Sequence, residues 1–297
     1  MNRRQSVGLM MCALLVLLSV TSGGAQTADK PAPKKAAAKK PAGEQTATGA
    51  SAEKKPMKRA SRKPAEEMKP EWFSVAIVRV RPDSFVDWQN LQKNVVIPAL
   101  KKSGLKSREI WEAGVFGEVT EVVVVTPIES FAQYDDVPRL RKALGEDAYR
   151  DYLEKVRKYV TSSRTMAAQS HPDLSYMGKM ASMTSPPKLA VVNSTHVVPG
   201  HTFAFENLIK TEVIPAMKKV GVIGYVVSRT ELGGDPYEYT SLTFYDNFAE
   251  IGKGSPVARA LGTQGVVRLS AKISGMIASQ ERVVARYNSE LSFQSAP

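Results

Sequence analysis

Two stretches of the chain carry the same pattern of hydrophobic and polar positions. When residues 72–176 are laid onto residues 189–293, identical residues recur 117 positions apart without a gap. The matched pairs include Pro98 and Pro215, Gly104 and Gly221, Phe131 and Phe248, Gly145 and Gly262, and Ser175 and Ser292. Because loops rarely match without gaps by chance, this repeat predicts a duplicated module.

The first strand and the first helix of each copy have clear signatures. Runs rich in β-branched residues at 73–80 and 189–198 predict strands. In the first copy, hydrophobic residues then recur every three or four positions, which predicts one buried helix face. These residues are Phe85, Trp88, Leu91, Val95 and Ala99. Gly104 and Gly221 are the expected left-handed C-caps. Pro98 and Pro215 should bend or break the helix just before them.

The remainder of each copy predicts a hairpin, a short helix, a longer helix and a last strand, so that the full order is β-α-β-β-α-β. The expected ranges are strands at 107–116, 119–126, 223–232 and 237–245, short helices at 129–134 and 246–251, and longer helices at about 146–160 and 263–277. The last strands should end at Tyr176 and Phe293. Since helices cover one face of each sheet, the two sheets are expected to pack face to face.

These patterns divide the chain into five segments. Residues 71–177 and 189–293 are expected to form the two α+β modules, with a connection at 178–188. Residues 26–70 are rich in Lys, Ala and Pro and contain no aromatic residue, which predicts a disordered linker. Residues 1–25 combine two arginines, an apolar stretch and small residues, which predicts a cleaved signal peptide. The mature protein is therefore expected to be periplasmic or secreted, by the general or the twin-arginine route. An uncleaved signal anchor is the alternative.

The positive charge of the protein lies mainly in the linker. The net charge is +12, and residues 27–70 hold twelve Lys and Arg against five Asp and Glu. Residues 71–297 hold 27 basic and 24 acidic residues, so the modules are nearly neutral. A nucleic-acid-binding sheet of this type needs exposed aromatic residues in a basic setting, and we therefore expect no specific nucleic acid. The linker could still contact an anionic surface.

Cysteine and histidine limit the chemistry of the mature protein. The single cysteine, Cys12, lies in the predicted signal, which leaves no disulfide, thiolate nucleophile or Cys-ligated metal. The histidines His171, His196 and His201 lie at unmatched places in the two copies. His201 suits a helix-capping or solvent role, and His171 a polar surface position. We therefore expect no haem, no tightly bound metal and no other cofactor.

Polar residues within the predicted strands are the candidates for a ligand pocket. Arg79 matches His196 across the repeat, and Glu112 matches Arg229. These four side chains could line a cavity between the sheets and bind a small ligand there. Alternatively, they could lie at wet strand ends or on the solvent side. Aromatic residues nearby could form a wall of the cavity or simply pack across strands. They are Tyr225, Tyr237 and Tyr239.

A resemblance to a known family rests on these elements together. The first helix contains "VIPAL", a hairpin follows, and "ESFAQYDD" or "DNFAEIGK" comes after the third strand. This arrangement resembles the dimeric α/β-barrel superfamily, and looks most like its NIPSNAP-type and antibiotic-biosynthesis-monooxygenase-type branches. The resemblance implies two ferredoxin-like modules in one chain, forming a pseudo-dimeric α/β barrel around a cavity. It also implies a monomer or a weak oligomer. Members of the superfamily include haem enzymes, cofactor-free oxygenases, isomerases and proteins of unknown activity.

Three functions are consistent with the sequence. The leading expectation is an exported envelope protein that binds a small or lipid-like molecule between its sheets without catalysing a reaction. The second is a cofactor-free oxygenase or isomerase acting in the same cavity. The third is an interaction module held to an anionic surface by its basic tail. No phosphate-binding loop, serine nucleophile elbow or Asp-rich metal loop appears in the sequence, so the motifs alone do not decide between them.

Overall fold

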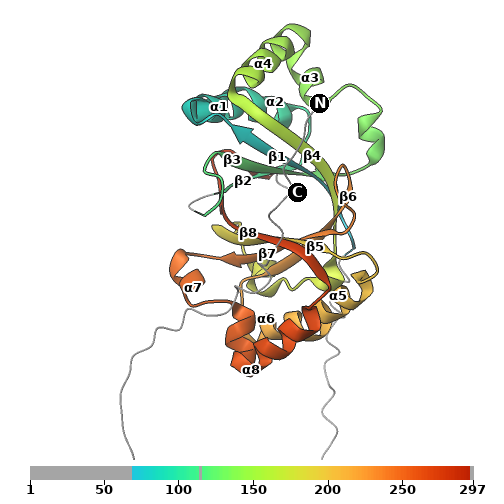
Figure 1. Ribbon diagram of the computed structural model, residues 1–297. Helices are drawn as coiled ribbons and strands as arrows, with labels where there is room; N and C mark the ends of the chain where they lie inside the picture. Colours follow the sequence, from blue (N-terminus) through green and yellow to red (C-terminus); the bar gives the residue numbers. More distant parts are fainter. Residues whose placement is uncertain (1–68, 114–115, 295–297) are drawn as a thin grey trace, which may run out of the picture. The chain divides into compact units, whose positions relative to one another are not determined.

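A computed structural model describes residues 69–113 and 116–294 (Figure 1). The predicted signal peptide and nearly all of the predicted linker lie outside these residues. Within the described part, no helix has both the length and the apolar character needed to cross a membrane.

The two halves of the described chain have the same order of elements. The first half contains β1 (Trp72–Val80), α1 (Phe85–Leu91), α2 (Ile97–Lys102), β2 (Ser107–Glu112), β3 (Glu121–Ile128), α3 (Arg139–Leu144), α4 (Glu146–Tyr159) and β4 (Val160–Ser170). The second half contains β5 (Leu189–Val197), α5 (Thr202–Leu208), α6 (Ile214–Val220), β6 (Tyr225–Leu232), β7 (Glu238–Tyr245), α7 (Phe248–Gly252), α8 (Pro256–Ile273), β8 (Ile277–Tyr287) and the short β9 (Phe293–Gln294). The predicted β-α-β-β-α-β order is therefore present in each half.

The first helix of each half changes geometry before its proline. A π-helical turn at Gln92–Val96 separates α1 from α2, and another at Ile209–Val213 separates α5 from α6. Pro98 and Pro215 then occupy the first turn of the following α-helix. Proline lacks the backbone N–H that a continuous α-helix would use for a hydrogen bond at this position. The wider π turn before the proline accommodates this missing donor. The predicted interruption is thus a local π turn within a continuing helix.

Glycines end or divide helices at equivalent places. Gly221 caps α6 in the left-handed conformation, and Gly104 also has a positive φ, as expected. Gly145 separates α3 from α4 with φ 79° and ψ 168°. Gly262 interrupts α8 with φ 66° and ψ 177°. The helix predicted at about 263–277 corresponds to the part of α8 after this glycine, which ends at Ile273 and not at 277. The part of α8 before Gly262 is a short additional helix, equivalent to α3.

The strands form one closed antiparallel barrel. Their order is β3-β1-β4-β6-β7-β5-β8-β2, and β2 pairs again with β3. The halves join where β4 pairs with β6 and where β8 pairs with β2. The expected face-to-face packing of two separate sheets is corrected here, because the edges of the two sheets are hydrogen-bonded to each other. The helices of each half cover the outside of the barrel (Figure 1).

The predicted last strands end earlier than expected. β4 ends at Ser170 and β8 at Tyr287, and the chain then turns before it contacts the other half again. Tyr176 forms a β-bridge with Tyr225, and Phe293 pairs with Arg108 on β2. Both contacts join the end of one half to the second strand of the other. The prediction failed because, in each half, it joined the long strand and the short contact after the turn into one continuous strand.

Hydrophobic clusters fill both sides of the barrel wall. One cluster lies under the helices of the first half and includes Trp88, Ile110 and Val122. A second lies under the helices of the second half and includes Val197, Val227 and Tyr239. A third is formed by Trp111, Ala190, Phe244 and Ala285, from strands of both halves. Since these residues lie on the opposite strand faces, this third cluster packs inside the barrel.

Candidate functional site

The four predicted pocket residues lie on two different faces of the barrel wall. On β1, Val78 and Val80 pack under the helices, so Arg79 between them faces the interior. His196 faces the interior for the same reason, because Val197 packs under the helices. Glu112 shares its face with Ile110 and therefore points toward the helices, as Arg229 does beside Val227. Two of the four residues therefore face the barrel interior and two face the helices of different halves, so the four do not form one polar wall.

Each of the two residues that face the interior lies beside one or two carboxylates of its own half. Arg79 lies 2.9 Å from Glu118 and 3.0 Å from Glu121, with half of its side chain exposed. His196 Nδ1 lies 3.2 Å from a carboxylate oxygen of Asp235. These contacts are at the ends of β1 and β5, which favours the wet strand-end alternative for both residues.

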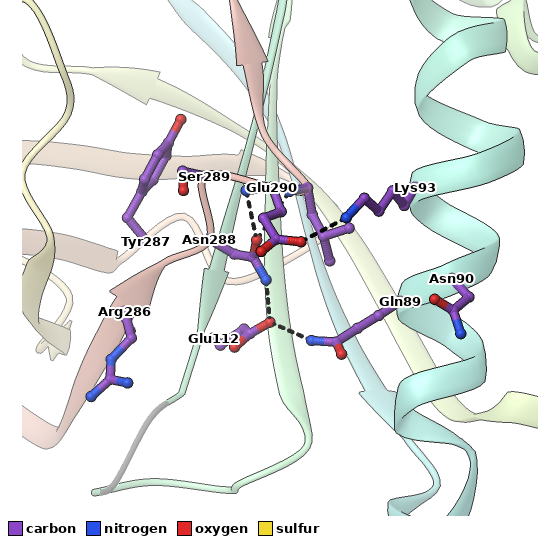
Figure 2. Close-up of a pocket in the computed structure, with 10 residues that line it drawn as sticks. Gln89, Asn90, Lys93, Glu112, Arg286, Tyr287, Asn288, Ser289 and Glu290 are labelled. Atoms are coloured by element: carbon purple, nitrogen blue, oxygen red, sulfur yellow. Dashed lines mark hydrogen bonds and ion pairs between the residues drawn. The ribbon is translucent and has the colours of Figure 1, made fainter.

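A pocket of about 340 Å³ lies beside Glu112, between α1, the end of β8 and the chain that follows β8 (Figure 2). It is lined by Gln89, Asn90, Lys93, Glu112, Arg286, Tyr287, Asn288, Ser289, Glu290 and Leu291. Most of these side chains are polar, and they come from both halves of the chain. The pocket therefore exists only because the barrel closes between β8 and β2.

Glu112 is held in the pocket wall by two neutral amides. Gln89 Nε2 donates a hydrogen bond of 3.0 Å to Glu112 Oε1, and Asn288 Nδ2 donates one of 2.7 Å to the same oxygen. One amide comes from α1 and the other from the segment after β8, as Figure 2 shows. Both donors are neutral, and no ion pair joins Glu112 to a cation among the described residues. Such a fixed carboxylate can accept hydrogen bonds from a ligand.

An ion pair lies at the edge of the same pocket. Lys93 Nζ and Glu290 Oε2 are 2.8 Å apart, and both side chains are more than half exposed. The hydrogen bond from Lys93 lowers the pKa of Glu290. Lys93 belongs to the π-helical turn, which therefore contributes directly to the pocket. Asn288 Oδ1 accepts backbone hydrogen bonds from Glu290 and Leu291, both of 3.0 Å, and so shapes the segment that carries Glu290.

Arg286 supplies a positive charge on the other side of the pocket (Figure 2). Its guanidinium carbon lies 5.9 Å from the ring of Phe248, within range of a cation–π contact. The neighbouring Tyr287 packs edge-on against Trp111, with 5.1 Å between ring centroids. Besides the Lys93–Glu290 ion pair at its edge, the pocket therefore presents the Glu112 carboxylate and the Arg286 guanidinium on walls built from opposite halves.

The equivalent place in the second half has the same layout, with an arginine where the first half has Glu112. The residues 117 positions from the main pocket residues are Glu206 for Gln89, Lys210 for Lys93, Arg229 for Glu112, His171 for Asn288 and Asp173 for Glu290. Lys210 and Asp173 form an ion pair of 2.7 Å, which matches the pair at the pocket edge. Arg229 lies 2.6 Å from Glu231 and 3.9 Å from Glu206.

Tyr239 and His171 fill much of this second place. Tyr239 is almost fully buried, and its hydroxyl donates a 2.6 Å hydrogen bond to Glu206 Oε1. Burial, together with Glu206, raises the pKa of Tyr239 to about 12. The ring of His171 packs 6.1 Å from that of Tyr239, and only 18% of its side chain is exposed. The expectation of a surface position for His171 was wrong, because the end of the first half folds over the second.

The three histidines lie in different surroundings in the described part of the chain. No group of three or more His, Cys, Asp or Glu side chains is placed to hold a metal among residues 69–113 and 116–294. His171 Nε2 is buried and makes no hydrogen bond, and no histidine lines the pocket at Glu112. His201 is exposed at the start of α5 and makes no capping hydrogen bond through its side chain.

Sequence reasoning identified Glu112 and missed the residues around it. Gln89, Lys93 and Asn288 were not singled out, although the 117-residue spacing contained a signal. Lys93 matches Lys210, and Glu290 matches the acidic Asp173. This pair of opposite charges, repeated in both halves, would have indicated a contact between the first helix of one half and the C-terminal end of the other half.

Comparison with known proteins supports the fold. No family model matches the chain, and no curated protein matches its sequence. An anthrone oxidase-like protein of known structure has a TM-score of 0.51 and 9% identity, over 76% of this chain and 94% of that chain. A candidate monooxygenase from Lactobacillus acidophilus NCFM has a TM-score of 0.48 and 12% identity, over 77% of this chain and 98% of that chain.

A chlorite dismutase from Candidatus Nitrospira defluvii, in complex with imidazole, has a TM-score of 0.46 and 10% identity, over 74% of this chain and 91% of that chain. The identities are low throughout, and only the first of the three similarities exceeds a TM-score of 0.5. This chain therefore shares with that anthrone oxidase-like protein an α+β fold, in which helices surround a closed antiparallel barrel of ferredoxin-like type.

Proposed function

We propose that the protein binds a small hydrophilic molecule in the pocket at Glu112. The observation that carries this proposal is a carboxylate fixed by two neutral amides in a cavity of about 340 Å³. A volume of this size is at the lower end for small-molecule sites. Both hydrogen bonds fall on Oε1, so Oε2 is the oxygen that a ligand would meet.

The charges of the pocket indicate the chemistry of its ligand. Glu112 accepts hydrogen bonds, so it suits a hydroxyl or amine group. Arg286 donates hydrogen bonds and carries a positive charge, so it suits an acceptor or an anionic group on the other side of the same molecule. The polar lining favours such a molecule over the lipid-like alternative, which would need a larger apolar surface. The proposed site lies outside the barrel wall, whereas a cavity between the sheets was expected from the sequence.

Native mass spectrometry of the full-length mature protein tests this proposal. The wild-type protein, purified under non-denaturing conditions from the cells that produce it, should carry a small bound molecule. Glu112→Gln keeps the size of the side chain and removes its charge, and should lose that molecule. Glu154→Gln makes the same chemical change on the exposed face of α4 and should retain it. An equal amount of bound ligand in wild type and Glu112→Gln would contradict the proposal.

A catalytic role for the same pocket would produce a different result. If Glu112 acted as a general base in a cofactor-free oxidation, oxygen uptake with candidate quinol substrates would depend on it. Activity that is lost in Glu112→Gln and retained in Glu154→Gln would favour that second function. Bound ligand without turnover favours binding alone.

We further propose that the protein acts after export, in the periplasm or outside the cell. The order of charged, apolar and small residues in 1–25 supports export. The basic segment 27–70 would then be free to contact an anionic surface. We also propose that the two halves are tandem ferredoxin-like modules related to the NIPSNAP type. Their shared element order and the equivalent ion pairs Lys93–Glu290 and Lys210–Asp173 support the duplication.

A further inference from the structure

Two opposite charges of the pocket stand side by side on the strands that close the barrel. Glu112 on β2 and Arg286 on β8 are direct partners in the antiparallel register. Directly opposite residues point to the same face of a sheet, and their β-carbons are about 4.5–5.5 Å apart. Both side chains line the pocket. A carboxylate and a guanidinium in this position usually form an ion pair.

Other partners hold these two charges apart. Glu112 Oε1 accepts its hydrogen bonds from Gln89 and Asn288, and Figure 2 shows these amides, and not Arg286, reaching the carboxylate. The guanidinium of Arg286 lies instead 5.9 Å from the ring centroid of Phe248. Among the described residues, neither Glu112 Oε2 nor the Arg286 guanidinium has a hydrogen-bonding partner. Both therefore remain available to a ligand in the pocket.

The second half has the same pair of positions without two free charges. The equivalent cross-strand partners are Arg229 on β6 and Gln169 on β4. Only Arg229 is charged, and it is already paired, because it lies 2.6 Å from Glu231. The fold therefore does not require opposite, unpaired charges at Glu112 and Arg286, and their presence is a property of the pocket.

We propose that the pocket binds an α-amino acid, with the ammonium group at Glu112 and the carboxylate at Arg286. The ammonium group donates to Oε2, and the guanidinium donates paired N–H groups to the carboxylate. Since no cation is paired with Glu112, an ammonium group gains more from it than a neutral hydroxyl does. An α-amino acid carries both groups on one carbon, so a small molecule can reach two side chains that start from neighbouring strands.

The remainder of the pocket suits a small polar side chain on that amino acid. Lys93 and Glu290 are 2.8 Å apart and neutralise each other, so they add no unmatched charge. Asn90 and Ser289 offer an amide and a hydroxyl group in the lining. A cavity of about 340 Å³ with such a lining favours a small hydrophilic ligand over a large apolar one. This inference rests on the function proposed for the pocket and names the class of its ligand.

The test uses the full mature chain, freed of small molecules by dialysis, and the common L-α-amino acids as probes. Thermal unfolding identifies the amino acid that raises the melting temperature most, and calorimetric titration gives its affinity. Two analogues of that amino acid then separate its charges. The matching 2-hydroxy acid lacks the ammonium group, and the matching 2-amino alcohol lacks the carboxylate.

At least one small polar amino acid should raise the melting temperature of the wild-type protein by several degrees. Each analogue should bind at least about tenfold more weakly, because each loses one charge-assisted contact. No response to any of the amino acids would overturn the inference. An analogue that binds as tightly as the amino acid itself would also overturn it.

Variants of the two charged residues should change the preference among the three probes. Glu112→Gln should lose the preference for the amino acid over the hydroxy acid. Arg286→Gln, which installs the residue found at Gln169, should lose the preference over the amino alcohol. Arg268→Gln removes a positive charge from an exposed position on α8 and should keep both preferences. Variants that weaken all three probes equally would make the two residues structural and count against the inference.

Native mass spectrometry of the purified protein distinguishes failure of this inference from failure of the function proposed for the pocket. The mass and fragmentation of the released molecule should show one amine and one acid group. A molecule that is lost in Glu112→Gln but lacks either group would overturn the α-amino acid and leave the proposed function standing. The absence of any bound molecule that depends on Glu112 would contradict both.

Discussion

The side-chain amide of Asn288 donates a 2.7 Å hydrogen bond to the carboxylate of Glu112, although 176 positions separate them in sequence. This bond ties the segment after β8 to β2, beside the pairing of these strands that joins the two halves. Asn288 also accepts two backbone hydrogen bonds, from Glu290 and Leu291. One side chain therefore connects the closure of the barrel to the shape of the pocket.

Replacing Asn288 by Ala should lower the free energy of unfolding by about 1–3 kcal/mol, because it leaves part-buried groups without their partners. Urea unfolding of the purified protein measures this change. Asn90→Ala is the control, since Asn90 lies on the exposed side of the same pocket and should change the stability by less than about 0.5 kcal/mol. Equal changes in the free energy of unfolding for the two substitutions would show that Asn288 does not stabilise the closed barrel.

Stability should decrease as the pH falls below about 6.5, in a way that depends on His171. Burial and the nearby charge of Arg229 lower the pKa of His171 in the folded protein, against the partial opposing effect of Glu206, Asp173 and Glu231. A histidine in the unfolded chain has a pKa of about 6.5. Above that pH the His171 side chain is neutral in both the folded and the unfolded state, and its contribution to stability does not change with pH. Below it, the unfolded state binds a proton that the folded state does not, until the pH reaches the folded pKa.

Urea unfolding at pH 7.5 and pH 5.5 checks this expectation. The contribution of His171 has a limiting slope of about 1.4 kcal/mol per pH unit. His171→Asn introduces the residue found at the equivalent position 288 and should flatten the pH dependence. His201→Asn, at an exposed position, should retain the wild-type profile. Indistinguishable profiles for wild type and His171→Asn would contradict the predicted effect.

Gly145 and Gly262 should each be intolerant of alanine. Both have a positive φ with an extended ψ, a conformation that costs other residues about 1–3 kcal/mol. A Cβ atom at either position would meet no neighbour within 4 Å, so the loss would come from the backbone alone. Gly252→Ala is the control, because Gly252 has open space and no positive φ. It should change the unfolding free energy by less than about 0.5 kcal/mol or raise it slightly.

A fragment of residues 72–180 should not behave as a stable monomer. Without the second half, β4 loses its partner β6 and β2 loses its partners β8 and β9. Two open strand edges and the apolar interior face would then be exposed to solvent. We expect a homodimer that rebuilds the closed barrel, or aggregation, and light scattering distinguishes these from a monomer. A well-folded monomer would show that each half is independently stable.

Export should remove the first 25 residues. The predicted cleavage after Ala25 leaves a mature chain that begins at Gln26. Mass spectrometry of the protein from fractionated cells measures its N-terminus and its compartment. An intact Met1 on a cytosolic protein would contradict export, and an intact Met1 in the membrane fraction would favour the signal anchor.

Local sequence predicted much of the fold but little of the site. The first strands, the first helices and the range of α4 follow from residue spacing within short segments, although the π turns before the two prolines were not predicted. The ends of β4 and β8 were misplaced, because a strand signal cannot show that the chain turns and then meets a new partner. Glu112 was identified, but its neighbour Asn288 lies in the other half, where no local pattern points to it.

The repeat, the order of elements and the places where proline and glycine change the helix geometry can be predicted from the order of residues alone, because they depend on short-range backbone chemistry. Which polar residues meet depends instead on how the strands pair in three dimensions. Arg79 and Glu112 lie on different strands, and β-strand alternation places them on opposite faces of the barrel wall. Closure of the barrel then brings Asn288 to Glu112, because the end of each half pairs with a strand of the other.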